Sequence, residues 1–410
     1  KKQGLRDKGE IPLASIKPHP IPKEHPRLYG SMEDLKLLRS RNGSHFSRVL
    51  QGADNVTFQG FGPTRNLYFA YLLTRKVAYK KALRGIAERC LEAGPTTDHV
   101  QFAERTYPVA LYYDACYDEM DAGERKRLEN FMIGIFDMNK APGVDSWVGP
   151  FHNSHLMRLG TFSMIGYTLY HENPRAQEIL DHTRKVEWES MLKRAFARAG
   201  AGGGWPEGTG YGHNCWMFLF DWVAMAARLE GWDVIAESPE WFHSFMAQSM
   251  FHCYPGTERN ARRIAIAGDG MENIGHRTSD FQLMTWLILA NYFGPLNDEL
   301  AAWFAEWLKA TPRAYKYHCA CFDFLYRGKK LPAKKLDSMV LRHANIPYGT
   351  VFMRSDWTPS ATWIRFQCGD IWACHQHLEQ NSFVLYKYSH LAPETGIYGA
   401  GVKVGMNHPH

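Results

Sequence analysis

Residues 31–335 alternate between long segments of periodic apolar residues and short breaks that contain glycine or proline. Apolar residues recur at three- and four-residue spacing in segments such as NLYFAYLLTRKVAYKKALRGIAERCLEA and SHLMRLGTFSMIGYTLY, which is typical of amphipathic helices. Breaks such as PGVDSWVGPFHN and AGAGGGWPEGTGYGH separate them. The pattern predicts successive helix pairs. If the pairs close into a toroid, their loops surround one cleft, where functional residues concentrate.

The two ends of the chain differ from this helical region. Residues 1–30 are rich in Pro, Lys and His, and we expect an extended arm that ends where Ser31 can cap the first helix. After residue 335 the segments become short and β-branched or aromatic, as in GTVFMRSDW and SFVLYKYSH, which predicts an antiparallel sheet over 336–410. These strands are few for a complete β-sandwich, so we expect the chain as given to stop partway through that domain.

Composition narrows the class of protein. The 410 residues carry a formal net charge of +6, which suits an anionic partner, but the basic residues are scattered and no basic helix with base-reading side chains is found, which argues against nucleic acid. No apolar run is long enough to cross a bilayer. Motifs of hydrolase triads, zincins, P-loops and dinucleotide-binding folds are absent from the sequence, so no organic cofactor is expected.

The stretch FHNSH places two histidines and an asparagine where a loop meets a predicted helix. Asn153 is a good helix cap, so this stretch can be an ordinary helix N-terminus with incidental histidines. Alternatively, His152, Asn153 and His155 form an anion site, in which amide and imidazole donors and the free helix N–H groups bind a carboxylate.

The stretch GGGWPEGTGYGH contains six glycines in twelve residues. Glycine lets a backbone take conformations and approaches that other residues exclude. A tight turn with a packed tyrosine is one interpretation of this loop. We favour a loop that passes close to a ligand and presents Tyr211 to it, with Glu207 and His213 nearby.

Two further clusters contain candidate ligands. If residues 372–377 form a strand, His375 and His377 point to the same face, and this HxH spacing suits a metal that has a further ligand. Glu394, or one of the C-terminal histidines, is the candidate, and a purely structural pair is the alternative. Arg263, which precedes the glycine-bracketed Asp269, either clamps a carboxylate or sulfate or holds a loop by an ion pair.

Taken in order, these clusters resemble the heparinase II/III-like polysaccharide lyases, a group that includes glycosaminoglycan and alginate lyases and dermatan-sulfate epimerase. The match runs from HPRLYG through FHNSH and PEGTGYGH to GTVFMRSDW and HQHLEQNSFVLYKYSHLAPETGIYG. The resemblance implies an α+β multidomain protein: an arm over 1–30, an (α/α) toroid over 31–335 and the start of an antiparallel β-sandwich over 336–410. It also implies β-elimination on a uronic-acid polysaccharide by a secreted or periplasmic enzyme, whose leader is absent from this chain.

The resemblance also implies roles for the clustered residues. Asn153 and His155, with His152 as the near alternative, would neutralise the uronate carboxylate and so stabilise the enolate-like intermediate. Tyr211 would protonate the departing O4 and, for one C5 stereochemistry, also take the C5 proton. His375 would be the base for the other face.

A structural divalent metal (zinc, manganese or calcium) is implied as well. His377 matches the family's metal ligand, and Glu394 stands where the family has an aspartate. The metal would orient the segment that carries His375. The family's third ligand is a histidine further along, and we expect that region to lie beyond the chain as given.

Substrate contacts and competing functions complete the sequence-based hypothesis. We predict sugar and anion contacts at Trp147, His152, Trp205, Glu207 and Arg263. A glycosaminoglycan such as heparan sulfate, hyaluronan or chondroitin is the first substrate class and alginate the second. The alternatives are a uronyl C5-epimerase and, less favoured, a non-catalytic sugar-binding protein. A glycoside hydrolase would need two carboxylates across the cleft, for which Glu207 and Asp269 are the one pair available.

Overall fold

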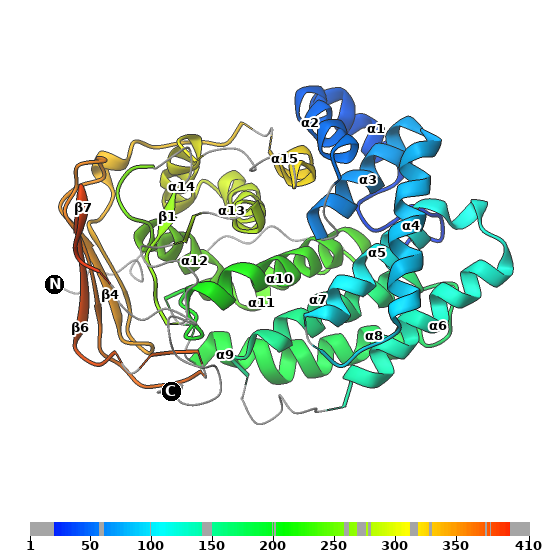
Figure 1. Cartoon of the computed structure of the whole chain (residues 1–410). Helices are drawn as coiled ribbons and strands as arrows, with labels where there is room; N and C mark the ends of the chain where they lie inside the picture. The colour runs from blue at the N-terminus through cyan, green and yellow to red at the C-terminus, as the bar shows by residue number, and fades with distance from the viewer. Residues whose placement is uncertain are drawn as a thin grey trace.

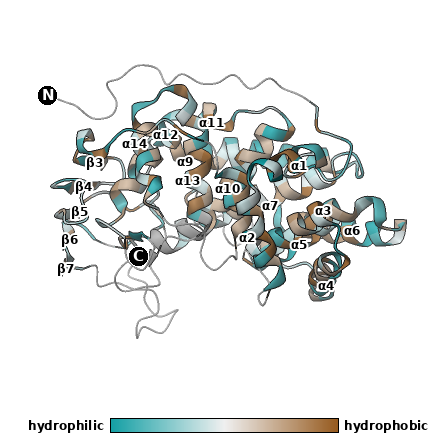
Figure 2. Cartoon of the chain, turned by 90° about the horizontal axis from the view of Figure 1, so that it is seen from above, coloured by the Kyte–Doolittle hydropathy of each residue, from teal (hydrophilic) through white to brown (hydrophobic). Residues whose placement is uncertain are grey.

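A computed structural model of the whole chain describes residues 20–56, 61–98, 100–141, 150–198, 200, 202–257, 262–268, 276–277, 280–311, 319–327, 330–373, 375–377 and 379–393. Most of these residues are helical, and a five-stranded antiparallel sheet follows the helices along the chain. The sheet lies at one end of the molecule, away from helices α3 to α6 (Figures 1 and 2). The predicted order of helices followed by an antiparallel sheet is confirmed.

The helices are α1 (Met32–Arg41), α2 (Gly43–Asp54), α3 (Phe61–Thr74), α4 (Val77–Ala93), α5 (Gln101–Cys116), α6 (Ala122–Asn139), α7 (Asn153–Thr168), α8 (Ala176–His182), α9 (Lys193–Arg198), α10 (Thr209–Leu229), α11 (Val234–Glu237), α12 (Pro239–His252), α13 (Asp280–Phe293), α14 (Glu299–Lys309) and α15 (Ala320–Tyr326). A π-helix, η4 (Thr183–Leu192), joins α8 to α9, and short 3₁₀ turns lie at η2 (Tyr117–Glu119), η5 (Gly294–Leu296) and η7 (Leu336–Ser338). Within the described parts, no helix is long and apolar enough to cross a bilayer.

Several long helices pack in a closed circuit. Helix α3 contacts α5, α5 contacts α7, α7 contacts α10, α10 contacts α13, α13 contacts α15, and α15 returns to α3. Every residue of α7 is buried, which requires protein around the whole helix. Gly160 explains how α7 approaches α10 so closely, because a Cβ at this position would lie 2.6 Å from Cβ of Phe218. The circuit fixes the N-terminus of α7, where the candidate site begins.

The larger sheet contains β3 (Arg342–Asn345), β4 (Thr350–Arg354), β5 (Trp363–Gln367), β6 (Ser382–Lys387) and β7 (Ser389–Ala392) in sequential order. Phe352 pairs with Arg365, which pairs with Val384, and all three are buried on the face that packs against the helices. Helix α12 contacts β3 and β4, and the Trp363 indole donates to the carbonyl of Phe251 at 2.7 Å. A separate two-residue pair joins β1 (Arg263–Ile264) to β2 (His276–Arg277).

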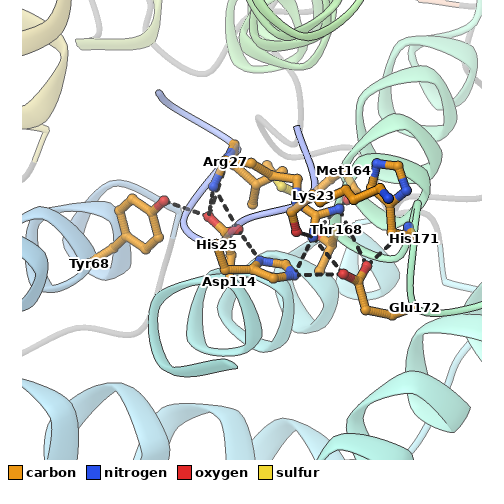
Figure 3. Close-up of polar contacts among 10 residues, drawn as sticks. Lys23, His25, Arg27, Tyr68, Asp114, Met164, Thr168, His171 and Glu172 are labelled. Atoms are coloured by element: carbon orange, nitrogen blue, oxygen red, sulfur yellow. Dashed lines mark hydrogen bonds and ion pairs between the residues drawn. The ribbon is translucent and has the colours of Figure 1, made fainter. Parts of the chain in front are cut away.

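The described part of the N-terminal arm is held by a buried polar network (Figure 3). His25 contacts Asp114 of α5 through Nδ1 (2.6 Å) and Glu172, just after α7, through Nε2 (3.2 Å). Arg27 donates to Glu172 at 2.6 Å, and its backbone N–H donates to Asp114 at 3.0 Å. The Tyr68 hydroxyl of α3 donates to Asp114 at 2.6 Å. This segment therefore links three helical segments of the circuit.

The His25 network predicts a pH-dependent stability. Burial alone would lower the pKa of His25, but its hydrogen bonds to Asp114 and Glu172 and the charge of Asp114 raise this pKa above its ordinary value, against the charge of Arg27. Because the folded-state pKa exceeds the unfolded value of about 6.5, the contribution of the imidazolium is fully present below that value. It is lost as the pH rises through the folded-state pKa.

We therefore expect the free energy of unfolding of His25→Gln to differ most from that of the wild type at acidic pH. The difference should shrink in alkaline buffer, where the wild-type imidazole is neutral. Urea unfolding followed by circular dichroism across the pH range measures both proteins. A difference that stays constant with pH would show that the pKa of His25 is the same in the folded and unfolded protein, which would contradict the raised value.

Candidate active site

The site begins at the N-terminus of helix α7. His152 is the N-cap residue, and its Nδ1 accepts a hydrogen bond from the Ser154 N–H at 3.2 Å and contacts the Ser154 hydroxyl at 2.8 Å. Asn153 then begins the helix with 1% of its surface exposed. FHNSH does begin a helix, as one interpretation predicted, but the cap is the ring of His152 and not Asn153, which is the first helical residue.

Glu207 holds Asn153 from the glycine-rich loop. Its Oε1 accepts hydrogen bonds from the Asn153 backbone N–H at 3.0 Å and from Asn153 Nδ2 at 2.7 Å. Its Oε2 accepts one from the Trp205 indole at 3.3 Å. The Glu207 side chain is fully buried, with 0% exposure. Two segments that are distant in sequence thus meet around one carboxylate.

The glycines of this loop approach other parts of the protein. Gly202, Gly203 and Gly208 have positive φ angles of 90°, 77° and 93°, which favour glycine. A Cβ on Gly203 would lie 2.3 Å from the Phe245 nitrogen of α12, and one on Gly204 would lie 1.7 Å from Nδ2 of Asn345 in β3. Since these contacts are to protein, the described glycines position the loop between α12 and the sheet.

The sheet side of the molecule contributes His375. Its ring stacks on the Tyr211 ring, with centroids 3.6 Å apart and an interplanar angle of 9°. Its Nε2 lies 3.8 Å from Glu207 Oε1, and its ring centroid lies 6.1 Å from that of His152. The structure therefore brings together five predicted residues from three segments: Asn153, His152, Glu207, Tyr211 and His375.

The segment with the two histidines is a turn and not the strand that we predicted over 372–377. Gln376 closes this turn, because its buried side chain accepts from the Trp372 N–H at 2.8 Å and donates to the Asp370 carbonyl at 2.9 Å. His375 faces Glu207, whereas His377 Nδ1 lies 3.6 Å from Glu379 Oε1. The prediction that His375 and His377 share one face is therefore wrong, because it assumed the alternation of a strand and the segment forms a turn.

His155 has its own buried partners. Its Nδ1 lies 2.8 Å from Glu187 Oε2 in η4, and Arg158 donates to the other oxygen of Glu187 at 3.1 Å. Burial alone would raise the pKa of Glu187, but hydrogen bonds from His155 and His182 and the charge of Arg158 lower it to about 2. Residues two apart on a helix point about 200° from each other, so Asn153 and His155 face different sides. The sequence analysis missed Glu187 and Arg158, although the helical offset was a usable signal.

The remaining predicted residues lie around this cluster or outside the described residues. Trp205 is 8% exposed and packs against Phe151 and Trp216, with centroids 5.5 and 5.2 Å apart. Arg263 is half-buried in β1. Trp147, Glu394 and Asp269 lie outside the described residues.

Burial sets the electrostatics of Glu207. Burial raises its pKa to about 7, and the Asn153 hydrogen bonds, the charge of His375 and the Trp205 indole offset part of the effect. Among the described residues, no lysine or arginine forms an ion pair with this carboxylate. Glu207 therefore exchanges a proton near neutral pH, close to the rings of His375 and Tyr211.

Glu207→Gln should stabilise the fold at neutral and alkaline pH. An acid whose folded-state pKa is raised makes the protein less stable as the pH rises from its unfolded value, 4.5, to its folded value, about 7. Glutamine keeps an oxygen acceptor for Asn153 and removes this penalty, so we expect a gain on the order of 1–3 kcal/mol above the folded-state pKa. Denaturant unfolding at acidic and alkaline pH in metal-free buffer measures it. A gain that does not grow with pH would contradict the raised pKa.

One group of side chains in the described residues can hold a metal ion. His152, Glu207 and His375 each place one donor atom within 4.8 Å of the other two. This group differs from the pair predicted from the sequence, His377 and Glu394.

Comparison with solved structures identifies a heparinase-like polysaccharide lyase fold. The chain is similar to heparinase III with a TM-score of 0.54 and 12% sequence identity, over 83% of this chain and 50% of that one. It is also similar to heparan sulfate lyase HepC from Pedobacter heparinus, with a TM-score of 0.46 and 15% identity, over 81% and 48% of the two chains. The chain thus spans about half the length of each. No protein-family model and no curated protein matches its sequence.

The likeness to heparinase III confirms the resemblance that the sequence motifs predicted, at the level of the fold. Because the identity is 12%, this likeness shows the fold alone. Any argument about the reaction therefore rests on the arrangement of side chains in this protein.

Proposed function

We propose that the protein is a polysaccharide lyase that cleaves a uronic-acid polysaccharide by β-elimination and leaves a C4–C5 unsaturated uronate. The observation that carries the proposal is the cluster of Asn153, Tyr211 and His375, with the Tyr211 and His375 rings 3.6 Å apart. These are an amide donor, a phenol and an imidazole, and β-elimination needs a donor to the carboxylate, an acid and a base.

The carboxylate would be bound at the start of α7. Asn153 Nδ2 gives one N–H to Glu207, and the amide group has a second N–H to donate to a substrate oxygen. The positive end of the helix dipole also favours an anion there. Glu207 opposes an anion only when it is ionised, and its raised pKa keeps part of the population neutral near pH 7. Binding of the uronate carboxylate stabilises the charge that develops after loss of the C5 proton.

Proton transfer would involve the stacked pair. His375 takes the C5 proton as base, and Tyr211 gives its phenolic proton to the departing O4 as acid. For the opposite C5 configuration, Tyr211 would act in its phenolate form, which takes the C5 proton and then gives it to the departing O4. Glu207 Oε1 lies 3.8 Å from His375 Nε2. Because the pKa of Glu207 is raised to about 7, this carboxylate can accept a proton from His375 near neutral pH.

The structural metal implied by the family would involve His377 and Glu394. Glu394 lies outside the described residues. Beside His377, Glu379 already forms an ion pair with Arg365 and accepts the Gly268 N–H at 3.3 Å. His377 is thus the one predicted donor that the described residues supply at this position, and we derive no step through a metal there.

Finer features of the family belong to the same proposal. The closed helix circuit would be the inner layer of an (α/α) toroid, and the sheet would begin a β-sandwich, with the cleft between them. A glycosaminoglycan is the first substrate class and alginate the second, and the protein would be secreted or periplasmic. A glycoside hydrolase is less favoured, because Glu207 is fully buried.

Ultraviolet absorbance during incubation with heparan sulfate, hyaluronan, chondroitin sulfates, dermatan sulfate and alginate tests the proposal. Rising absorbance establishes elimination and names the substrate class. If every trace stays flat, exchange of the C5 proton in deuterated water is measured. Exchange without cleavage would establish the epimerase alternative. If neither cleavage nor exchange is seen, the lyase proposal and the epimerase alternative are both overturned.

A further inference from the structure

Three metal-ligand side chains converge at the candidate site. Their donor atoms all lie within 4.8 Å of one another, and they come from separate segments: the α7 N-cap, the glycine-rich loop and the turn after β5.

Two buried oxygen-bearing side chains of this site are poorly compensated. The Glu207 carboxylate has 0% exposure, and within the described structure it has an ion-pair contact with His375 at 3.8 Å. Burying a carboxylate without a cation is costly. Beside it, Asn153 is 1% exposed, and its side-chain oxygen has no hydrogen-bond partner in the described structure. A buried carboxylate whose ion-pair contact is one histidine at 3.8 Å, beside a buried amide oxygen without a hydrogen bond, favours a cation as ligand.

We propose that His152, Glu207 and His375 bind a divalent transition metal of the zinc type. The two imidazole nitrogens and one carboxylate oxygen are the ligand set of open, three-residue zinc sites. Calcium and magnesium prefer oxygen ligands, so the two imidazoles argue against them. Nickel and copper share the preference for imidazole, and zinc is the probe that we choose.

The surrounding hydrogen bonds orient the ligands. Metal binding through Nε2 of His152 requires the proton on Nδ1; the Ser154 hydroxyl, 2.8 Å from Nδ1, can accept that proton in place of the present bond from the Ser154 N–H. Asn153 binds Oε1 of Glu207 twice, which fixes the rotation of the carboxylate. Such outer partners commonly orient the ligands of a metal site. Zinc binding would draw these three donors closer together, to bond lengths of about 2.0–2.2 Å from the metal.

The consequence for activity rests on the proposed function. A metal on His375 and Glu207 removes the base and covers the place where the uronate carboxylate would bind. Zinc should therefore inhibit cleavage in competition with the polysaccharide, and a chelator should restore it.

Zinc binding to the full metal-free chain tests the site without any substrate. Isothermal titration should show one zinc per chain, and binding should weaken at least 10-fold in Glu207→Gln and in His375→Ala. His377→Ala is the matched control, because it changes the other histidine of the same turn and should keep the affinity. Circular dichroism and thermal melting check that each variant is folded.

Cobalt(II) provides a second measurement that does not depend on the variants. Cobalt in the wild-type site should give the intense visible absorption of a four-coordinate N/O site, and zinc should displace it. The proposal is overturned if zinc does not bind, or if binding survives in His375→Ala and disappears in His377→Ala. Because these readouts need no polysaccharide, they are independent of the lyase assay, in which a flat trace would overturn the proposed function alone.

Discussion

Tyr211→Phe should abolish cleavage of the uronic-acid polysaccharide and leave the fold intact. The change removes one oxygen, and with it the proton that the departing O4 needs. Loss of a positioned general acid costs about 10²–10⁴-fold in rate. The phenylalanine ring can still stack on His375, where the present rings lie 3.6 Å apart. Initial rates of ultraviolet absorbance, compared at equal protein concentration, measure the effect.

Tyr388→Phe is the control for this experiment, because Tyr388 is 70% exposed in the turn between β6 and β7 and lies outside the candidate site. It should keep the wild-type rate. Unchanged thermal melting of both variants would show that their folds are intact. If Tyr211→Phe keeps full activity while folded, Tyr211 has no part in the mechanism.

Asp114→Ala should be among the most destabilising substitutions in the protein. Asp114 is fully buried and accepts hydrogen bonds from the backbone N–H groups of Arg27 and Leu28 and from the Tyr68 hydroxyl, and it forms an ion pair with His25 (Figure 3). With alanine at this position, the two backbone N–H groups and the Tyr68 hydroxyl stay buried without their acceptor. His25 also loses one of its two carboxylate partners. Removing one member of a buried pair costs about 3–5 kcal/mol.

Urea unfolding followed by circular dichroism measures this loss, with Asp118→Ala as the control. Asp118 lies four residues further along and is exposed, so its substitution should change the free energy of unfolding by no more than about 0.5 kcal/mol. A loss below about 1 kcal/mol for Asp114→Ala would mean that the arm contributes little to the fold.

The candidate site was only partly accessible from the sequence. Asn153, Tyr211 and His375 could be proposed together because each stands in a motif of the resembled family, and the structure brings all three to one place. The direction of His155 could have been worked out, since a helix turns by about 100° per residue. The partner that holds it, Glu187, is 32 residues away, and no local pattern connects the two.

Other features depend on contacts between distant segments. Gln376 makes a turn where alternation predicted a strand, because its side chain folds back and bonds the backbone of Asp370 and Trp372. The glycines before Tyr211 fit against Phe245 and Asn345, which lie far from them in sequence. The raised pKa of Glu207 comes from burial, which the residue type alone does not determine.

The sequence by itself determined the order of helices and sheet, because helical and strand periodicities are local and repeat over many residues. It also determined which residue types are available for chemistry. Only the tertiary structure decided which of them meet, which are buried and which side chains take up each other's hydrogen bonds. These properties depend on packing between segments that are tens to hundreds of residues apart, and local patterns carry little information about such packing.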